Sequence, residues 1–132
     1  MSIWTLSLAA LSGVALMALA EARQAAPAES RGNSSKALAA LPLGPEIDGM
    51  AGRQLRMRLV TLAPGGLIAA HSHRDRPGLE YVLQGTVIEH RNGQLREYRA
   101  GAAIAADKDT VHGWENKGDT PVLLLPVDIV KE

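Results

Sequence analysis

The chain has 132 residues with 14 basic and 14 acidic side chains, so it is about one domain long and has no formal net charge. No long run of either sign occurs, which removes the electrostatic reason to expect a nucleic-acid partner. The sequence contains no cysteine, which excludes disulfides, thiol nucleophiles and zinc–thiolate sites. Any metal ion must therefore be held by nitrogen and oxygen ligands.

The first 22 residues have the composition of an export signal. Residues 3–20 contain no charged side chain, and small-x-small sites ending at Ala20 and Ala22 are typical of signal-peptidase cleavage. The same run, at about 18 residues, is just long enough to cross a bilayer, and no Lys or Arg precedes it. We predict a cleaved signal peptide over 1–22, with a retained membrane-anchor helix as the alternative. The first outcome makes the protein periplasmic or secreted, and the second anchors it in the inner membrane facing the periplasm.

Residues 23–44 are rich in Ala, Pro, Ser and Gly and are predicted to form a linker. The remaining residues, 45–132, are predicted to form one globular domain. Their short apolar runs are interrupted by Gly, Pro, Asp and Asn every 8–12 residues or so, which is typical of an antiparallel sandwich or barrel. No sustained 3.6-residue period occurs there, so the predicted fold class is all-β. The strand-forming segments are 53–62, 67–73, 79–85, 86–90, 95–100 and 120–130, and residues 101–116 carry an apolar run, an acidic turn and another strand.

Gly and Pro residues predict how these strands are connected. Residues 63–66 (APGG) predict a turn between two strands, and Asn92-Gly93 predicts a tight hairpin. Pro126 has no amide hydrogen to donate to a neighbouring strand. The last strand is therefore predicted to lie at a sheet edge or to be bulged at that residue.

Two of the four histidines form a His-x-His pattern. His71 and His73 point to the same side of a strand, with Cα atoms about 6.6 Å apart. Imidazoles at this spacing can converge on one ion at metal–nitrogen distances of about 2.0–2.1 Å. A pair of solvated surface side chains is the alternative. His90 lies at a strand end beside the polar hairpin and is predicted to be exposed.

The spacing of glycines and histidines resembles the two motifs of the cupin family, and of small single-domain bacterial cupins in particular. The resemblance covers about residues 53–130, with only 15 residues between the motifs. Asp replaces the Pro and Gly that the family usually has in the second motif. The first motif runs Gly65, five residues, His71-x-His73 and later Gly85; the second runs Gly101, five residues, Asp107-x-Asp109, two residues, His112, three residues, Asn116.

The resemblance implies a double-stranded β-helix, or jelly-roll barrel, with His71, His73 and His112 at its mouth as metal ligands. It also implies a divalent transition-metal cofactor, of which Fe, Mn, Ni and Zn suit such ligands. The expected partner is a small organic molecule. Small cupins often form homodimers through edge strands, and the apolar segment 122–130 is the surface that this analogy suggests.

The carboxylate ligand of the family is missing from its usual place. Counting back from Gly85, it would fall at position 78, where this chain has Gly78. Glu80 points to the same side of the strand, with its Cα displaced by about 6.6 Å. Three interpretations remain open: a three-histidine site, a site in which Glu80 is a fourth ligand or a nearby base, and a metal-free barrel. Arg74 and Arg76 favour the last, because their charge opposes a cation.

Further residues are predicted around the site by strand alternation. Trp114 and Asn116 share a face with His112 and are expected in a substrate pocket, although Trp114 alternatively fills the core. Val82 lies on the face of Glu80 and is also placed in the pocket, whereas Tyr81 lies on the opposite face. The expected function is an exported metal-dependent enzyme of dioxygenase or isomerase type, with no catalytic residue assigned. The alternative is a metal-free barrel that binds or senses a small molecule.

Overall fold

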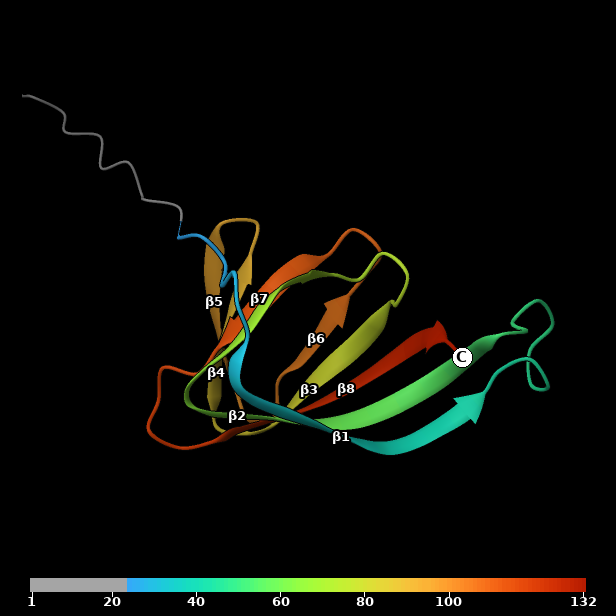
Figure 1. Cartoon of the computed structure of the whole chain (residues 1–132), viewed down its shortest axis with the longest axis horizontal. Helices are drawn as coiled ribbons and strands as arrows, with labels where there is room; N and C mark the ends of the chain where they lie inside the picture. Colours follow the sequence, from blue (N-terminus) through green and yellow to red (C-terminus); the bar gives the residue numbers. More distant parts are fainter. Residues whose placement is uncertain (1–23) are drawn as a thin grey trace, which may run out of the picture.

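The computed structural model describes residues 24–132, and every regular element in that part is a β-strand (Figure 1). The predicted all-β fold is therefore confirmed. No helix among the described residues is long and apolar enough to span a membrane. The predicted signal or anchor segment, 1–22, lies outside the described residues, so export stays a prediction. The strands are β1 (Arg31–Pro42), β2 (Arg53–Ser72), β3 (Gly78–Gln84), β4 (Thr86–Arg91), β5 (Gln94–Arg99), β6 (Ala103–Ala106), β7 (Val111–Glu115) and β8 (Val122–Lys131).

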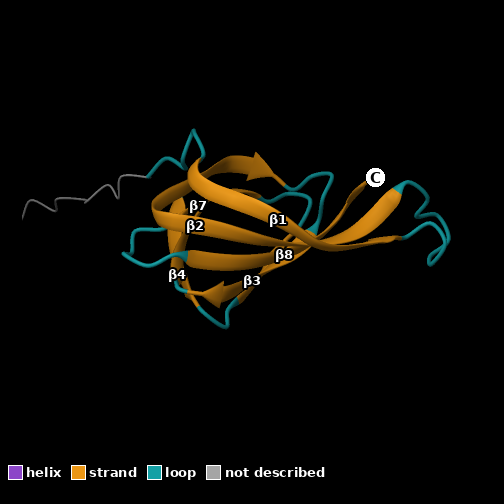
Figure 2. Ribbon diagram, turned by 60° about the horizontal axis from the view of Figure 1, so that its bottom comes forward, coloured by secondary structure: helices purple, strands orange, loops and turns teal. Residues whose placement is uncertain are grey.

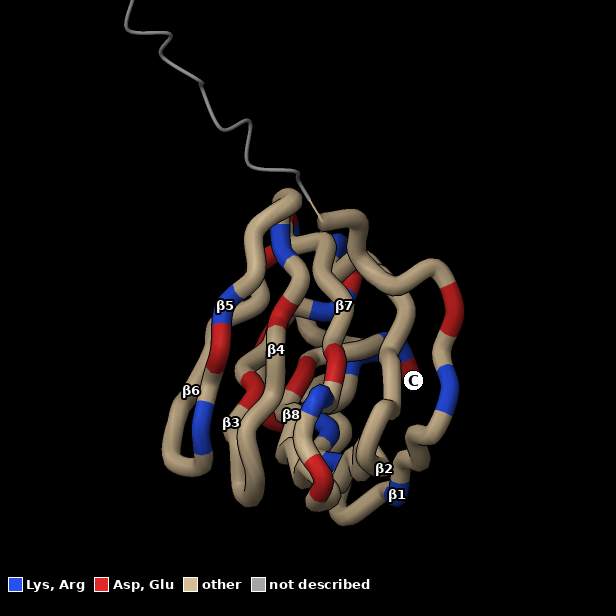
Figure 3. The backbone as a smooth tube through the Cα atoms, turned by 90° about the vertical axis from the view of Figure 1, so that its left-hand side faces the viewer, with Lys and Arg blue, Asp and Glu red and all other residues tan. Residues whose placement is uncertain are grey.

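The strands form one antiparallel sheet that curls over on itself into a half-barrel (Figure 2). Its order is β5-β4-β7-β2-β8-β3-β6, and β1 pairs with β2 outside this path. The long strand β2 belongs to both parts of the curled sheet. Residues 53–62 pair with β8 and with most of β1, and residues 67–72 pair with β7. Basic and acidic residues are interspersed along the strands (Figure 3).

The predicted turn at 63–66 is a bend inside β2 rather than a connection between two strands. Gly65 has a φ of 74°, a left-handed conformation that glycine adopts without steric cost. Its amide donates to the Asn116 carbonyl at 2.9 Å, and the Asn116 amide donates to the Gly66 carbonyl at 3.0 Å. The bend is where β2 stops pairing with β8 and begins to pair with β7.

The Asn116 side chain fixes this bend from inside the protein. It is fully buried, and its Nδ2 donates to the carbonyl oxygens of Leu62 (3.1 Å), Ala63 (3.2 Å) and Thr120 (2.8 Å). Its Oδ1 accepts a hydrogen bond from the Gly118 amide at 2.9 Å. The side chain thus replaces ladder hydrogen bonds at a place where the strand changes partners.

Residues 31–42, predicted to be part of the 23–44 linker, form β1 instead. This strand pairs with β2 from Pro42 opposite Gln54 to Asn33 opposite Leu62. All of its residues are exposed. It therefore lacks the alternation of buried and exposed residues by which a strand is recognised in a sequence.

Of the two alternatives predicted for the last strand, a sheet edge or a bulge at Pro126, the edge is wrong. β8 lies between β2 and β3, so the apolar segment 122–130 is also not a free edge for dimerisation. The ladder to β2 is interrupted at Pro126, between the pairs Met57–Val127 and Val60–Leu124. Proline is tolerated in this central strand because the ladder is interrupted at the residue that has no amide hydrogen to donate. Homodimerisation itself stays a prediction.

The apolar core lies between the two halves of the sheet. It is built from aliphatic side chains and one tryptophan that come from six strands. Trp114 is the largest fully buried side chain of this group. The core residues are Val60, Leu62, Val82, Val87, Ile104, Trp114, Val122 and Leu124.

Replacing Asn116 by alanine is expected to lower the free energy of unfolding by about 2–4 kcal/mol, because it leaves buried backbone groups without partners. Urea denaturation of the wild type and the variant measures this. Replacing the exposed Asp119 in the same loop by alanine is the control and should change stability little. An Asn116→Ala protein as stable as the wild type would contradict the structural role.

Candidate metal centre

The structure brings together the four residues that the sequence singled out as ligands. His71 lies near the end of β2, His73 directly follows that strand, Glu80 lies in β3 and His112 lies in β7. One donor atom from each lies within 4.8 Å of those of the others. The β2–β7 register places His71 directly opposite His112.

In each imidazole of the cluster, the Nδ1 atom faces an oxygen that only accepts hydrogen bonds. His71 Nδ1 is 2.9 Å from the Ala69 carbonyl, and His73 Nδ1 is 3.0 Å from the Arg76 carbonyl. His112 Nδ1 is 2.7 Å from Glu89 Oε1. Each Nδ1 must therefore carry the proton, which leaves the Nε2 lone pairs unprotonated in the neutral rings.

These three Nε2 atoms point toward one another. His73 Nε2 lies 3.2 Å from His71 Nε2 and 3.0 Å from His112 Nε2. Two lone pairs at such distances repel, because neither nitrogen has a proton to share. Two nitrogens bound to one ion at 2.0–2.1 Å are themselves about 2.9–3.4 Å apart. The spacing of the cluster therefore fits a shared cation.

Burial favours the uncharged form of two of these imidazoles, those of His71 and His73. Desolvation lowers the pKa of His71 to about 4, although the Ala69 carbonyl partly opposes this shift. Desolvation also lowers the pKa of His73 against the effect of the Arg76 carbonyl. The neutral ring is the form that binds a metal ion, so no proton has to be displaced from either residue at pH 7.

Glu80 supplies a carboxylate that is nearly fully buried, at 7% exposed. Its Oε1 lies 3.8 Å from His112 Nε2, and its Oε2 has no hydrogen-bond partner. Desolvation raises the pKa of this carboxyl group, and the positive charges around it only partly offset the effect. An unpartnered buried carboxylate oxygen beside three converging nitrogens is suited to a cation.

Packing against β8 explains why position 78 is a glycine. A Cβ atom at Gly78 would lie 2.5 Å from the Val127 carbonyl oxygen and 2.9 Å from Asp128 Cβ. No side chain fits there without moving the backbone. Glu80 lies on the same face of β3, opposite Pro126, and reaches the cluster from this displaced position.

Glu89 is a residue of the site that the sequence analysis missed. It lies in β4, is fully buried and accepts hydrogen bonds from His112 Nδ1 (2.7 Å), Arg91 Nε (2.7 Å) and Tyr98 Oη (3.3 Å). Burial by itself would raise the pKa of this carboxyl, but the hydrogen bonds from His112 and Arg91 lower it overall. The sequence signal that could have found Glu89 is its spacing from Val87. Residues two apart share a face of a strand, so a carboxylate there points inward with Val87.

The prediction that His90 is exposed is wrong. Its side chain is 6% exposed, and its Nε2 lies 2.8 Å from Glu115 Oε2. The strand end is covered because β4 lies between β5 and β7, where His90 pairs with Leu95 on one side and Gly113 on the other. His90 is not part of the ligand cluster.

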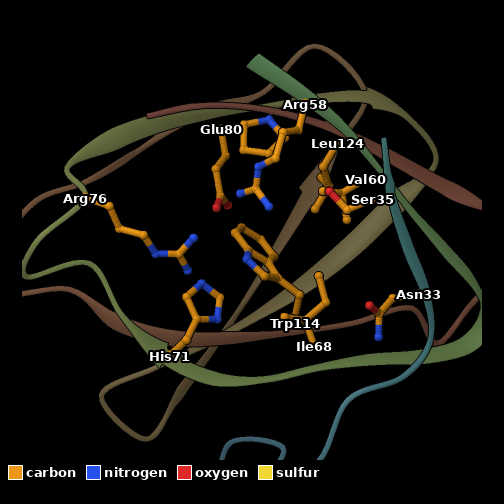
Figure 4. A pocket seen from close by; sticks show the side chains of 11 residues that line it. Asn33, Ser35, Arg58, Val60, Ile68, His71, Arg76, Glu80, Trp114 and Leu124 are labelled. Atoms are coloured by element: carbon orange, nitrogen blue, oxygen red, sulfur yellow. The ribbon is translucent and has the colours of Figure 1, made fainter. Parts of the chain in front are cut away.

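A cavity of about 140 Å³ opens beside the cluster (Figure 4). His71, Glu80 and Trp114 form part of its wall. Trp114 is also packed against the His112 ring, with centroids 5.0 Å apart, so it lines the cavity and fills the core at once. The two other predicted pocket residues do not line this cavity: Val82 is in the core and Asn116 holds the bend of β2. Tyr81 is exposed, as its strand position predicts.

Residues 58–128 match the sequence profile of the cupin domain family, which is more than half of the chain. An oxalate-binding protein of Thermotoga maritima is 32% identical over 69 residues, covering 52% of this chain and 57% of that protein. The auxin-binding protein ABP19b of Prunus persica is 26% identical over 99 residues, covering 71% of this chain and 47% of that protein. The chain thus spans about half the length of each of these relatives.

Solved structures show the same fold. KdgF from Halomonas sp. has a TM-score of 0.62 with 20% identity, covering 79% of this chain and 87% of that one. A predicted oxalate decarboxylase from Thermotoga maritima has a TM-score of 0.53 with 22% identity, covering 77% of this chain and 98% of that one. At these identities the likeness concerns the fold and not the activity.

Replacing Glu89 by glutamine is expected to weaken divalent-metal binding about 10–100-fold, because the amide orients the His112 ring less strongly than the carboxylate does. Competition with a chromophoric chelator measures the affinity. Glu97→Gln, in the neighbouring strand β5 and 53% exposed, is the matched control. Equal affinities for the two variants would show that Glu89 does not support the cluster.

Proposed function

Because the chain belongs to the cupin family, we propose that it binds one divalent transition-metal ion through His71, His73 and His112. The observation that carries this proposal is the convergence of three Nε2 atoms whose rings already donate through Nδ1. Glu80 is the proposed fourth ligand, since its Oε2 is buried without a partner. Imidazole and carboxylate together suit Fe, Mn, Ni and Zn ions.

The site is proposed to act on a small organic molecule in the adjoining cavity. A bound ion supplies Lewis acidity, and redox capacity where the metal is iron or manganese. His112 is held in place by Glu89, and Trp114 excludes water from one wall of the cavity. Burial raises the pKa of Glu80, which favours the protonated form of this carboxyl group relative to an exposed one.

The proposed reaction class is a dioxygenase or isomerase type of conversion. The names of the two relatives state binding of oxalate and of auxin, which supports a small organic ligand for this chain. The second candidate function is a metal-free barrel that binds or senses such a molecule. It is favoured by one observation: Arg58 and Arg76 line the same cavity as the cluster and oppose a cation.

Elemental analysis of protein reconstituted with divalent metals and then dialysed tests the proposal. The wild type is expected to retain about one equivalent of metal, and His112→Ala is expected to retain none. Glu80→Gln separates the two ligand sets: it should bind metal more weakly if Glu80 is a ligand and unchanged if three histidines suffice.

The matched control is His90→Gln, which alters the fourth histidine outside the cluster and should leave the metal content unchanged. A wild type that holds no more metal than His112→Ala would refute metal binding. It would leave the metal-free binding barrel as the function.

A further inference from the structure

We propose that the cavity beside the metal centre contains a carboxylate-binding subsite formed by Arg58 and Arg76, so that the small molecule is an organic acid. This inference rests on the proposed function, because it names the class of ligand for the same site. Arg58 comes from β2, and Arg76 comes from the loop between β2 and β3. Both line the cavity together with His71 and Glu80.

The first observation is an excess of guanidinium groups over carboxylates. Asp128, 3% exposed, accepts two hydrogen bonds from Arg56: Nε to Oδ1 at 3.0 Å and Nη2 to Oδ2 at 2.8 Å. Arg58 and Arg76 lie farther from the same Oδ2, at 3.5 and 3.7 Å, and form no hydrogen bond with it. A bidentate pair with Arg56 already uses this carboxylate, so it does not match the charges of the other two.

The second observation is an unpartnered donor on Arg58. Its Nε is buried and has no hydrogen-bond partner. Desolvation and the neighbouring Arg56 lower the pKa of this guanidinium, which agrees with a charge that its surroundings do not fully compensate. Because an unpaired buried donor on a charged group is costly, an acceptor from a ligand would stabilise it.

The third observation is the direction of the side chains. Figure 4 shows Arg58 and Arg76 reaching into the cavity from different sides, with the Glu80 carboxylate between them. Two arginines and one glutamate leave one net positive charge in the lining. When Glu80 is used as a metal ligand, its charge no longer offsets those of the two arginines, and a planar guanidinium matches a carboxylate in shape.

The size of the cavity limits the acid. A volume of about 140 Å³ corresponds to the space of roughly four to five water molecules. The remainder of the wall combines apolar side chains, among them Val60, Ile68 and Trp114, with the polar residues Asn33 and Ser35 of β1. A ligand with one or two carboxylates and a short or flat body fits this combination of size and lining.

The experiment compares oxalate with its neutral diamide, oxamide, by calorimetric titration of the metal-loaded protein. The wild type is expected to bind oxalate at least tenfold more tightly than oxamide. Arg58→Met and Arg76→Met are each expected to weaken oxalate binding about 10–100-fold, with the metal content, measured after each titration, unchanged. The control is Arg74→Met, an exposed arginine that does not line this cavity and should bind oxalate as the wild type does.

Equal affinities for oxalate and oxamide would overturn the subsite, and so would Arg58→Met and Arg76→Met proteins that behave like Arg74→Met. If Arg58→Met does not fold, the Arg76→Met variant alone tests the subsite. Its substitution leaves the hydrogen bonds between Asp128 and Arg56 in place, so the fold is expected to be retained. If the wild type takes up no metal, the proposed function fails while the subsite is still tested: oxalate added to metal-free protein should then shift the Arg58 Nε NMR signal in the wild type. An unshifted signal overturns the subsite.

Discussion

The pairing of His71 on β2 with His112 on β7 is the contact on which the rest of the site depends. It exists because β2 leaves β8 at the bend around Gly65 and continues along β7. Asn116 holds that bend through three backbone carbonyls. His73 then joins the pair from the end of the same strand, and its backbone amide donates to the Thr110 carbonyl at 2.9 Å. A single change of strand partner therefore assembles all three imidazoles.

The carboxylate of the centre shows how packing and ligand position are linked. The close approach of β8 to Gly78 removes the space for a side chain at the family's usual ligand position. The next residue on the same face, Glu80, lies opposite Pro126 and faces the histidines. Arg58, whose Nε has no hydrogen-bond partner, lies in the same stretch of β2, where the ladder to β8 is interrupted at Pro126. The irregular part of the sheet is thus the part that surrounds the cavity.

Much of this could be predicted from the sequence, because histidine spacing and strand alternation act over a few residues. The all-β fold and the grouping of His71, His73 and His112 follow from such local patterns together with the cupin resemblance. β1 escaped prediction because its residues are exposed on both faces, so hydrophobic patterning does not mark it. The contacts of Glu89 with His112 and of His90 with Glu115 depend on the β4–β7 pairing. Such a pairing joins residues more than twenty positions apart, and no local pattern indicates it.

The most direct test of a metal ion shared by the three histidines is anomalous diffraction from crystals of the reconstituted protein, recorded on both sides of the absorption edge of the metal. The expected result is one anomalous peak within about 2.0–2.2 Å of the Nε2 atoms of His71, His73 and His112. Crystals of metal-loaded protein with no peak between these nitrogens, or with a peak elsewhere on the surface, would contradict it.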